Sequence, residues 1–176
     1  WAKKQPLNLY EVADKCQAGR PEYPNKDDAF KIVPGTVLND CRDAKHYDKK
    51  IKVWTVNNKR YAVKAPVFPG GNGWIKVFEQ RQCKPVLNKG KVVIDEIFGK
   101  SGSLRMDIDG QPYAFMKRLT PLNVTQHSMY NLITNYWTNT AENNKFNKDW
   151  KIYSTEDDMR MDKNAWKICP ENFDGT

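Results

Sequence analysis

Residues Leu104–Met116 read LRMDIDGQPYAFM, and this stretch indicates how the chain folds. Two strand-like runs, Leu104–Ile108 and Tyr113–Met116, flank the dipeptide Asp109-Gly110. An Asp-Gly pair tolerates the positive φ angles that a two-residue turn between antiparallel strands requires. The stretch therefore predicts a β-hairpin within an antiparallel sheet.

The segments around this hairpin predict further strands. Ile51–Val56 and Tyr61–Ala65 are joined by the Asn-rich turn Asn57–Lys59, so they predict an earlier hairpin. Pro69–Gly73 is predicted to be a loop, because Gly and Pro dominate it. The predicted strands outside these two hairpins are Trp74–Phe78, Lys91–Ile94, Trp150–Tyr153 and Ala165–Cys169.

Two segments predict helices. Asn and Asp residues precede the apolar run Ala29–Val33 and Pro34-Gly35 follows it, which predicts a short helix near the N-terminus. A longer helix near 124–142 is predicted from apolar residues at three- and four-residue spacing. These residues are Met129, Leu132, Ile133, Tyr136 and Trp137. Strands in succession with helices set apart predict an α+β fold, and the length fits a single domain, 1–176.

The composition narrows the class of protein. The chain has 29 Lys and Arg against 21 Asp and Glu, which gives a formal net charge of +8. A basic balance favours anionic partners such as nucleic acid, acidic glycans, anionic membranes or acidic proteins, and it is also common in proteins that are merely soluble. No apolar run reaches the roughly 18 residues of a membrane span. Trp1 does not open a signal peptide, so we expect a mature secreted form whose targeting segment has been removed.

Four cysteines lie far apart in the chain: Cys16, Cys41, Cys83 and Cys169. Zinc and redox motifs place cysteines in close pairs, which are absent here. Two structural disulfides in an oxidising compartment are therefore expected, and a secreted protein with them. The residues alone leave all three pairings open. The sequon at Asn123 is a candidate glycosylation site.

The candidate catalytic groups are few. The two histidines are His46, in a polar stretch, and His127, which we place on the polar face of the predicted helix. Neither has the neighbours of a catalytic triad, so His46 is kept as the catalytic candidate only if the protein is an enzyme. The loop Gly70–Gly73 lacks the ending of a phosphate-binding loop, and the acidic pairs lack the spacing of a calcium loop. No metal or other cofactor is predicted.

Basic and aromatic residues alternate along the first predicted hairpin and the strand after it. Such a sheet can offer cations and ring platforms to single-stranded nucleic acid. Equally, Trp54 can face the core while lysines protect an edge strand from aggregation. The candidate binding residues are Lys50, Lys52, Trp54, Lys59, Arg60, Lys64 and Lys76.

The order of short motifs between about residues 15 and 78 resembles the fungal guanyl-specific ribonucleases and the ribonuclease-like secreted effectors of plant-pathogenic fungi. The motifs are Asp14–Gly19, Tyr23, Asp27–Val33, Ala65-Pro66-Val67, Pro69–Gly73 and Lys76-Val77-Phe78. The resemblance implies a secreted α+β protein with its early cysteine tied to the chain end. It thus favours Cys16–Cys169 together with Cys41–Cys83.

The sequence departs from that family at the catalytic positions. Lys64 stands where the family places its glutamate base, and Lys76 stands near the position of its phosphate-binding arginine. His46 with Tyr47 matches only the first His and Tyr of the family. General acid–base catalysis requires two partners, so these departures favour a protein without catalytic activity.

The sequence thus predicts a secreted, non-catalytic, effector- or virulence-like binding protein that acts on a host or target protein, or on RNA or another polyanion. The first alternative is a secreted ribonuclease or cytotoxin that uses His46. The second is an extracellular module that binds glycans or membrane surfaces through exposed tryptophans.

Overall fold

The structure, a computed structural model, describes residues 9, 12–13, 16–22, 59–64, 73–81, 84–123, 127–134 and 143–167. Its strands are β1 (Lys59–Lys64), β2 (Trp74–Arg81), β3 (Lys84–Asn88), β4 (Ser103–Ile108), β5 (Gln111–Arg118) and β6 (Trp150–Tyr153). Its helices are the 3-10 helix η1 (Cys16–Gly19) and the α-helices α3 (Lys91–Ser101), α4 (Met129–Thr134) and α5 (Glu156–Met161).

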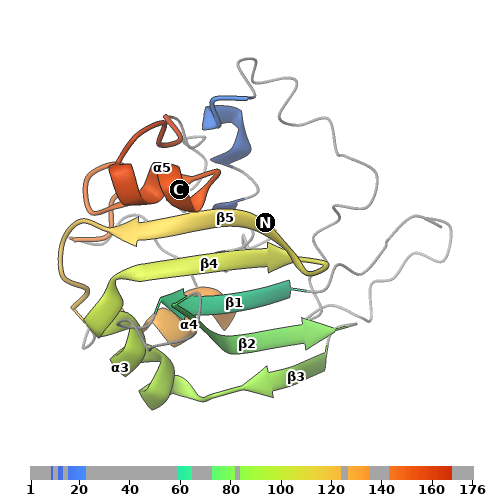
Figure 1. The fold of residues 1–176 in the computed structure, drawn as a ribbon. Helices are drawn as coiled ribbons and strands as arrows, with labels where there is room; N and C mark the ends of the chain where they lie inside the picture. The colour runs from blue at the N-terminus through green and yellow to red at the C-terminus, as the bar shows by residue number, and fades with distance from the viewer. Residues whose placement is uncertain are drawn as a thin grey trace, which may run out of the picture.

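The six strands form one antiparallel sheet in the order β3-β2-β1-β4-β5-β6 (Figure 1). β1 lies in the middle because it pairs with both β2 and β4. The predicted α+β fold with an antiparallel sheet is therefore confirmed. The predicted pairing of Ile51–Val56 with Tyr61–Ala65 in a hairpin is wrong, because β2 and β4 occupy both edges of β1. Ile51–Val56 itself lies outside the described residues, as does the predicted helix at 29–33.

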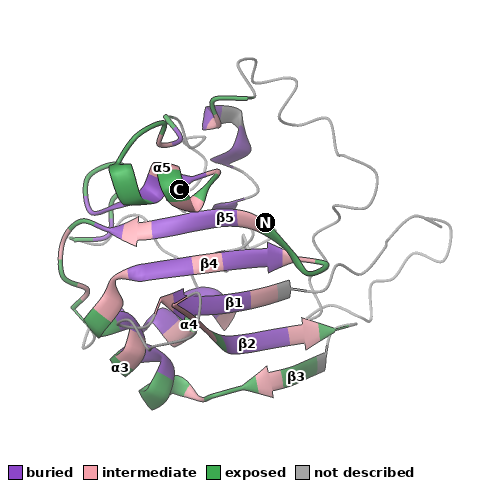
Figure 2. Ribbon diagram, in the orientation of Figure 1, coloured by how far each residue is buried: buried purple, intermediate pink, exposed green. Residues whose placement is uncertain are grey.

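One face of the sheet carries the main hydrophobic core. Alternation along the strands directs Tyr61 and Val63 of β1 into this core, together with Leu104 and Met106 of β4. Helices α3 and α4 cover this face through buried side chains that include Ile94, Phe98, Met129, Leu132 and Ile133. Figure 2 shows the buried residues concentrated along the central strands and the exposed ones on β3 and the outer surface of α3.

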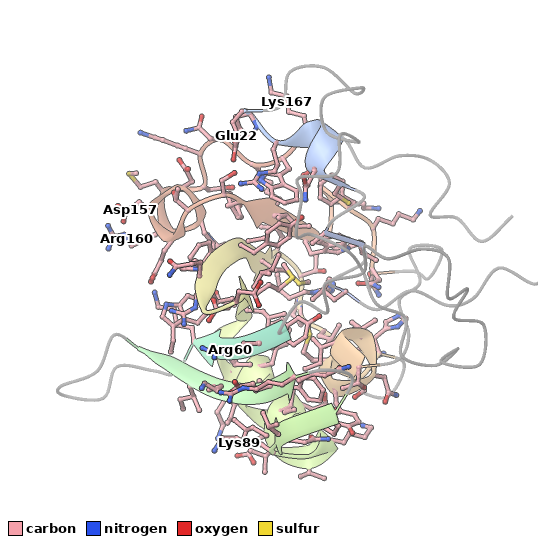
Figure 3. All side chains as sticks on the ribbon, turned by 90° about the vertical axis from the view of Figure 1, so that its right-hand side faces the viewer. Glu22, Arg60, Lys89, Asp157, Arg160 and Lys167 are labelled. Carbon is pink, nitrogen blue, oxygen red and sulfur yellow. The ribbon has the colours of Figure 1, made fainter. Side chains whose placement is uncertain are left out.

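Among the described residues, the elements that pack on the opposite face, called the outer face here, cover only part of it. Helix α5 packs over its β5–β6 end, where Met159 joins a small cluster with Phe115 and Tyr153. Figure 3 views the sheet from the side and shows α5, with Asp157 and Arg160 labelled, on one side and α4 on the other. The outer face of β1, β2 and β4 carries polar and charged side chains instead.

The hairpin predicted from Asp109-Gly110 is confirmed. β4 and β5 pair from Ser103↔Lys117 to Ile108↔Gln111, with a shift of register between Met106 and Asp107. Asp109 and Gly110 both have positive φ angles, 46° and 85°, as a two-residue turn of this hand requires.

One predicted strand, Lys91–Ile94, is wrong, because these residues begin α3. Val92 and Val93 suggested a strand, but Ile94 and Phe98 are four residues apart and enter the core together. The buried Asp95 carboxylate also binds the start of α4, accepting a hydrogen bond from the Ser128 hydroxyl at 2.7 Å. Tertiary packing therefore overrides the local strand preference.

The C-terminal strand predicted at Ala165–Cys169 is also wrong for its described part, 165–167, which is irregular. The Trp166 N–H donates to the carbonyl oxygen of Ile152, whereas the Lys167 N–H donates to that of Gly19. The backbone divides its hydrogen bonds between β6 and the segment after η1, so no strand ladder forms. Residues 168–169 lie outside the described part.

The helix predicted near 124–142 is described only as α4, Met129–Thr134. His127 and Ser128 precede the helix rather than belonging to it, and the Ser128 hydroxyl accepts a hydrogen bond from Asn131 N at 3.3 Å. A serine at this position caps the first turn, which explains why the helix begins later than predicted. Residues 124–126 and 135–142 lie outside the described part.

Three elements were not predicted: η1, β3 and α5. β3 contains Pro85, which lacks an N–H and is tolerated on this edge strand. α5 begins after Thr155, whose hydroxyl accepts a hydrogen bond from Asp158 N. The run Thr155–Asp158 therefore carries the signature of a helix start, although its acidic residues taken alone indicate only a charged surface.

Candidate functional site

Five described cations lie on the outer face of three neighbouring strands. They are Arg60 and Lys64 on β1, Lys76 and Arg81 on β2, and Arg105 on β4, and we call this surface the basic face. Strand pairing brings them together. Arg60 lies opposite Glu79, and Ala62 lies between Lys76 on one side and Arg105 on the other. Figure 3 labels Arg60 on β1.

Glu79 of β2 is buried and receives three of these cations. Its Oε1 accepts from Arg60 Nε at 3.0 Å and from Arg81 Nε at 2.9 Å, and Oε2 accepts from Lys76 Nζ at 3.0 Å. The Lys76 hydrogen bond and the two guanidinium groups lower the pKa of Glu79 to about 2, although burial opposes the shift. The carboxylate is therefore ionised over the whole physiological pH range. We call Arg60, Lys76, Arg81 and Glu79 the Glu79 cluster.

Lys64 is bound to a carboxylate from α5. Its Nζ lies 2.6 Å from Glu156 Oε1, and Trp74 Nε1 donates to Oε2 of the same carboxylate at 2.9 Å. Burial raises the pKa of Glu156, but these two hydrogen bonds and the charge of Lys64 outweigh it and the pKa is lowered. Glu156 thus ties α5 to β1 and β2.

Arg105 pairs one-to-one with Asp107 on the same strand, with 2.8 Å between Arg105 Nε and Asp107 Oδ1. Its guanidinium lies over the Trp74 ring, 5.7 Å from the centroid, and Lys64 Nζ lies 5.4 Å from the same ring. Trp74 also contacts Phe115. Because cations, Phe115 and Glu156 surround this half-buried ring, it is not an open stacking platform.

The structure brings together three of the seven candidate binding residues, Arg60, Lys64 and Lys76. Lys59 opens β1, and only its backbone is described. The other three candidates, Lys50, Lys52 and Trp54, lie outside the described residues. His46 lies outside them as well. The alternative of an enzyme that uses His46 therefore stays a hypothesis.

The cysteine framework is described at one position. Cys16 is fully buried in the main core and is disulfide-bonded. Cys41, Cys83 and Cys169 lie outside the described residues, so the two-disulfide framework and its pairing stay predictions. Asn123 is exposed, and Val124 and Thr125 of its sequon are not among the described residues.

His127 does not lie on a polar helix face as predicted. It is buried just before α4, beside Ser128, whose hydroxyl donates to the carboxylate of Asp95. Asp95 also accepts from Tyr130 N and from Lys91 Nζ, so it joins α3 to α4. The serine donates directly to the aspartate rather than to an imidazole, so these residues do not form a Ser-His-Asp catalytic relay. The Ser128 hydroxyl instead caps the first turn of α4.

Sequence reasoning missed several members of the site: Glu79, Arg81, Arg105, Asp107 and Glu156. For Glu79 and Arg81 a signal was present, because the charged alternation of β2 continues three residues past the predicted strand end at Phe78. For Glu156 there was none, because it lies 92 residues from Lys64 in the chain.

Within the described ranges, no three His, Cys, Asp or Glu side chains gather as a metal site would require. Among these same residues, no helix has the length and apolar character needed to cross a membrane. Comparison of the chain with protein-family models, with curated proteins and with solved structures finds no match.

Proposed function

We propose that the protein is a secreted, non-catalytic binding protein whose basic face binds a polyanion. The observation that carries this proposal is the charge balance of that face. Among the described residues, the salt bridges of this face join five cations to three carboxylates, Glu79, Asp107 and Glu156, so the cations outnumber the carboxylates by two. Clustered positive charge attracts polyanions and speeds their association.

The disulfide at Cys16 supports the secreted part of the proposal. Disulfides persist in oxidising compartments and are rare in the cytosol. The overall charge of +8 is compatible with an extracellular basic protein.

Glu79 supports the non-catalytic part. A general base works best when its pKa lies near the working pH, whereas the pKa of Glu79 is about 2. Its lone pairs are also engaged by three cations. A ribonuclease that uses His46 is the alternative. Incubation with RNA at neutral pH tests it, because cleavage that disappears in His46→Ala would replace our proposal.

A charge-reversal experiment tests the binding surface. Lys64→Glu with Lys76→Glu should weaken binding of a single-stranded RNA, and binding by the unchanged protein should fall steeply with salt, because bound cations release counterions from the strand. Lys89→Glu with Lys100→Glu makes the same change of charge away from the basic face, on exposed residues, and should weaken binding far less. Fluorescence anisotropy at several salt concentrations measures both pairs.

Heparin and anionic vesicles belong in the same assay. If RNA, heparin and vesicles all fail to bind at low salt, the basic face is a solvated surface and the proposal is wrong. Equal losses in the two charge-reversal pairs would also contradict it, because net charge alone would then explain binding.

A protein partner is the second candidate function, and one observation favours it. Val86 on β3 and Val92 and Val93 in the first turn of α3 are exposed, at 55%, 77% and 41%. Exposed apolar side chains in neighbouring segments are typical of protein-binding surfaces. Val92→Asp should abolish such binding and leave RNA binding unchanged.

The glycan- or membrane-binding alternative requires exposed tryptophans. Of the tryptophans in the described ranges, Trp150 and Trp166 are fully buried and Trp74 is half-buried among charged neighbours. These three rings do not support that alternative.

A further inference from the structure

The excess positive charge of the basic face is not spread evenly. Lys64 pairs with Glu156, and Arg105 pairs with Asp107, each cation with one carboxylate. The Glu79 cluster, in contrast, has three cations around one carboxylate. Among the described ion pairs, the surplus of two cations therefore lies at the Glu79 cluster.

The cluster is built with its anion inside and its cations outside. The side chain of Glu79 is 5% exposed, whereas those of Lys76 and Arg81 are 47% and 56% exposed. Arg60 is more covered, at 25%, and its guanidinium reaches toward the β4–β5 turn at Gly110. An anion that arrives from solvent thus meets cations first.

Glu79 also positions these cations. Its contacts with Arg60 and Lys76 each use one donor, and Arg81 contributes Nε and Nη2, the latter at 2.8 Å. Long flexible side chains lose conformational entropy when a ligand immobilises them. Side chains that are already held by Glu79 have lost part of that entropy before the ligand arrives.

We propose that the Glu79 cluster is a preorganised subsite for phosphate groups of a single-stranded nucleic acid, with Glu79 as the positioning residue. This inference rests on the proposed function and assigns the contact point within it. Arg60 and Arg81 carry the planar guanidinium groups that match phosphate oxygens. Lys64 and Arg105 extend the row of cations across strands spaced about 4.8 Å apart, which suits a ligand with repeated charges.

Replacement of Glu79 distinguishes two explanations of binding: cations that Glu79 holds in position, and electrostatic attraction by net charge alone. Glu79→Gln raises the net charge by one, so attraction alone predicts tighter binding. If Glu79 positions the cations, this variant instead weakens binding about tenfold, because three side chains must be immobilised by the ligand. Glu96→Gln is the matched control: Glu96 is exposed on α3, pairs with Lys100, and gives the same change of charge away from the site.

The probe is a fluorescein-labelled oligouridine strand about twelve nucleotides long, within the range that single-strand binders cover. Binding is measured by anisotropy between about 50 and 200 mM salt. Weaker binding by Glu79→Gln with little change in Glu96→Gln supports the inference. Binding by Glu79→Gln that is as tight as, or tighter than, that of Glu96→Gln overturns it.

Substitutions at the half-exposed cations keep the inference testable if Glu79→Gln does not fold. Arg81→Ala should weaken binding of the oligouridine strand and reduce the slope of log K against log salt by about 0.7, the value for one single-strand phosphate contact. If RNA binds but Arg81→Ala and Lys76→Ala have no effect, the subsite is wrong while the proposed function stands. If heparin binds and the oligouridine strand does not, the phosphate assignment is wrong.

Discussion

Glu79 is the residue on which the arrangement of the basic face depends. It is a buried carboxylate on a strand whose neighbours in space, Arg60, Lys76 and Arg81, are all cationic. A buried charge is costly unless it is paired and hydrogen-bonded, and here four donor contacts satisfy one carboxylate. The same contacts hold three long side chains in place.

The acid stability of the protein should depend on Glu79. Its pKa is lowered from 4.5 to about 2, so its ion pairs contribute fully to the free energy of unfolding above pH 4.5. This contribution is lost as the pH falls from 4.5 toward 2, because the folded protein must then bind the proton. Urea unfolding of the unchanged protein and of Glu79→Gln should show a stability difference that narrows across this window. A difference that stays constant from pH 6 to pH 2.5 would contradict the assignment.

At the scale of elements, glycine is needed in the β4–β5 hairpin but not in helix α3. Gly110 completes the turn with a φ of 85°, a conformation that L side chains rarely adopt. Gly99 lies within α3, where its φ is not positive and a Cβ added to it would meet no atom within 4 Å. The first glycine is required by the backbone and the second is not.

The two alanine substitutions should therefore have opposite effects. Gly110→Ala should lower the free energy of unfolding by about 1 kcal/mol or more, because alanine is strained at positive φ. Gly99→Ala should raise it by about 0.5–1 kcal/mol, because alanine is the better helix former. Chemical denaturation measures both, and a loss of stability in Gly99→Ala would indicate a packing role for that position.

At the scale of the whole molecule, long-range contacts join the N-terminal and C-terminal parts of the described chain. Cys16 is bonded through a disulfide in the main core, and Lys167 N donates to the carbonyl oxygen of Gly19 at 2.7 Å. Arg20 stacks on Trp166, with its guanidinium carbon 5.0 Å from the ring centroid. The segment after η1 is thus packed against the segment after α5.

Mass spectrometry of the unreduced protein tests the cysteine framework. We expect no free thiol, and we expect Cys16 linked to Cys169 and Cys41 linked to Cys83. Loss of a structural disulfide commonly costs about 2–5 kcal/mol, so reduction should lower the midpoint of thermal unfolding. A peptide that links Cys16 to Cys41 would refute the pairing, and two free thiols would refute the two-disulfide framework.

The sequence by itself determined the strands whose signals are local. β1, β2, β4, β5 and β6 were predicted, because alternation and the Asp109-Gly110 turn act between neighbours in the chain. The presence of Arg60, Lys64 and Lys76 on adjacent strands was also predictable from the same pattern.

Only the tertiary structure decided where helix α3 forms and which charged side chains come together on the sheet. It made Lys91–Ile94 a helix, because Ile94 and Phe98 share a core and Asp95 binds the start of α4. It also gathered three cations around Glu79 and brought Glu156 to Lys64 across 92 residues. Local preferences amount to fractions of a kcal/mol per residue, whereas burial and ion pairing link residues that are distant in the chain, so sequence pattern alone does not reveal them.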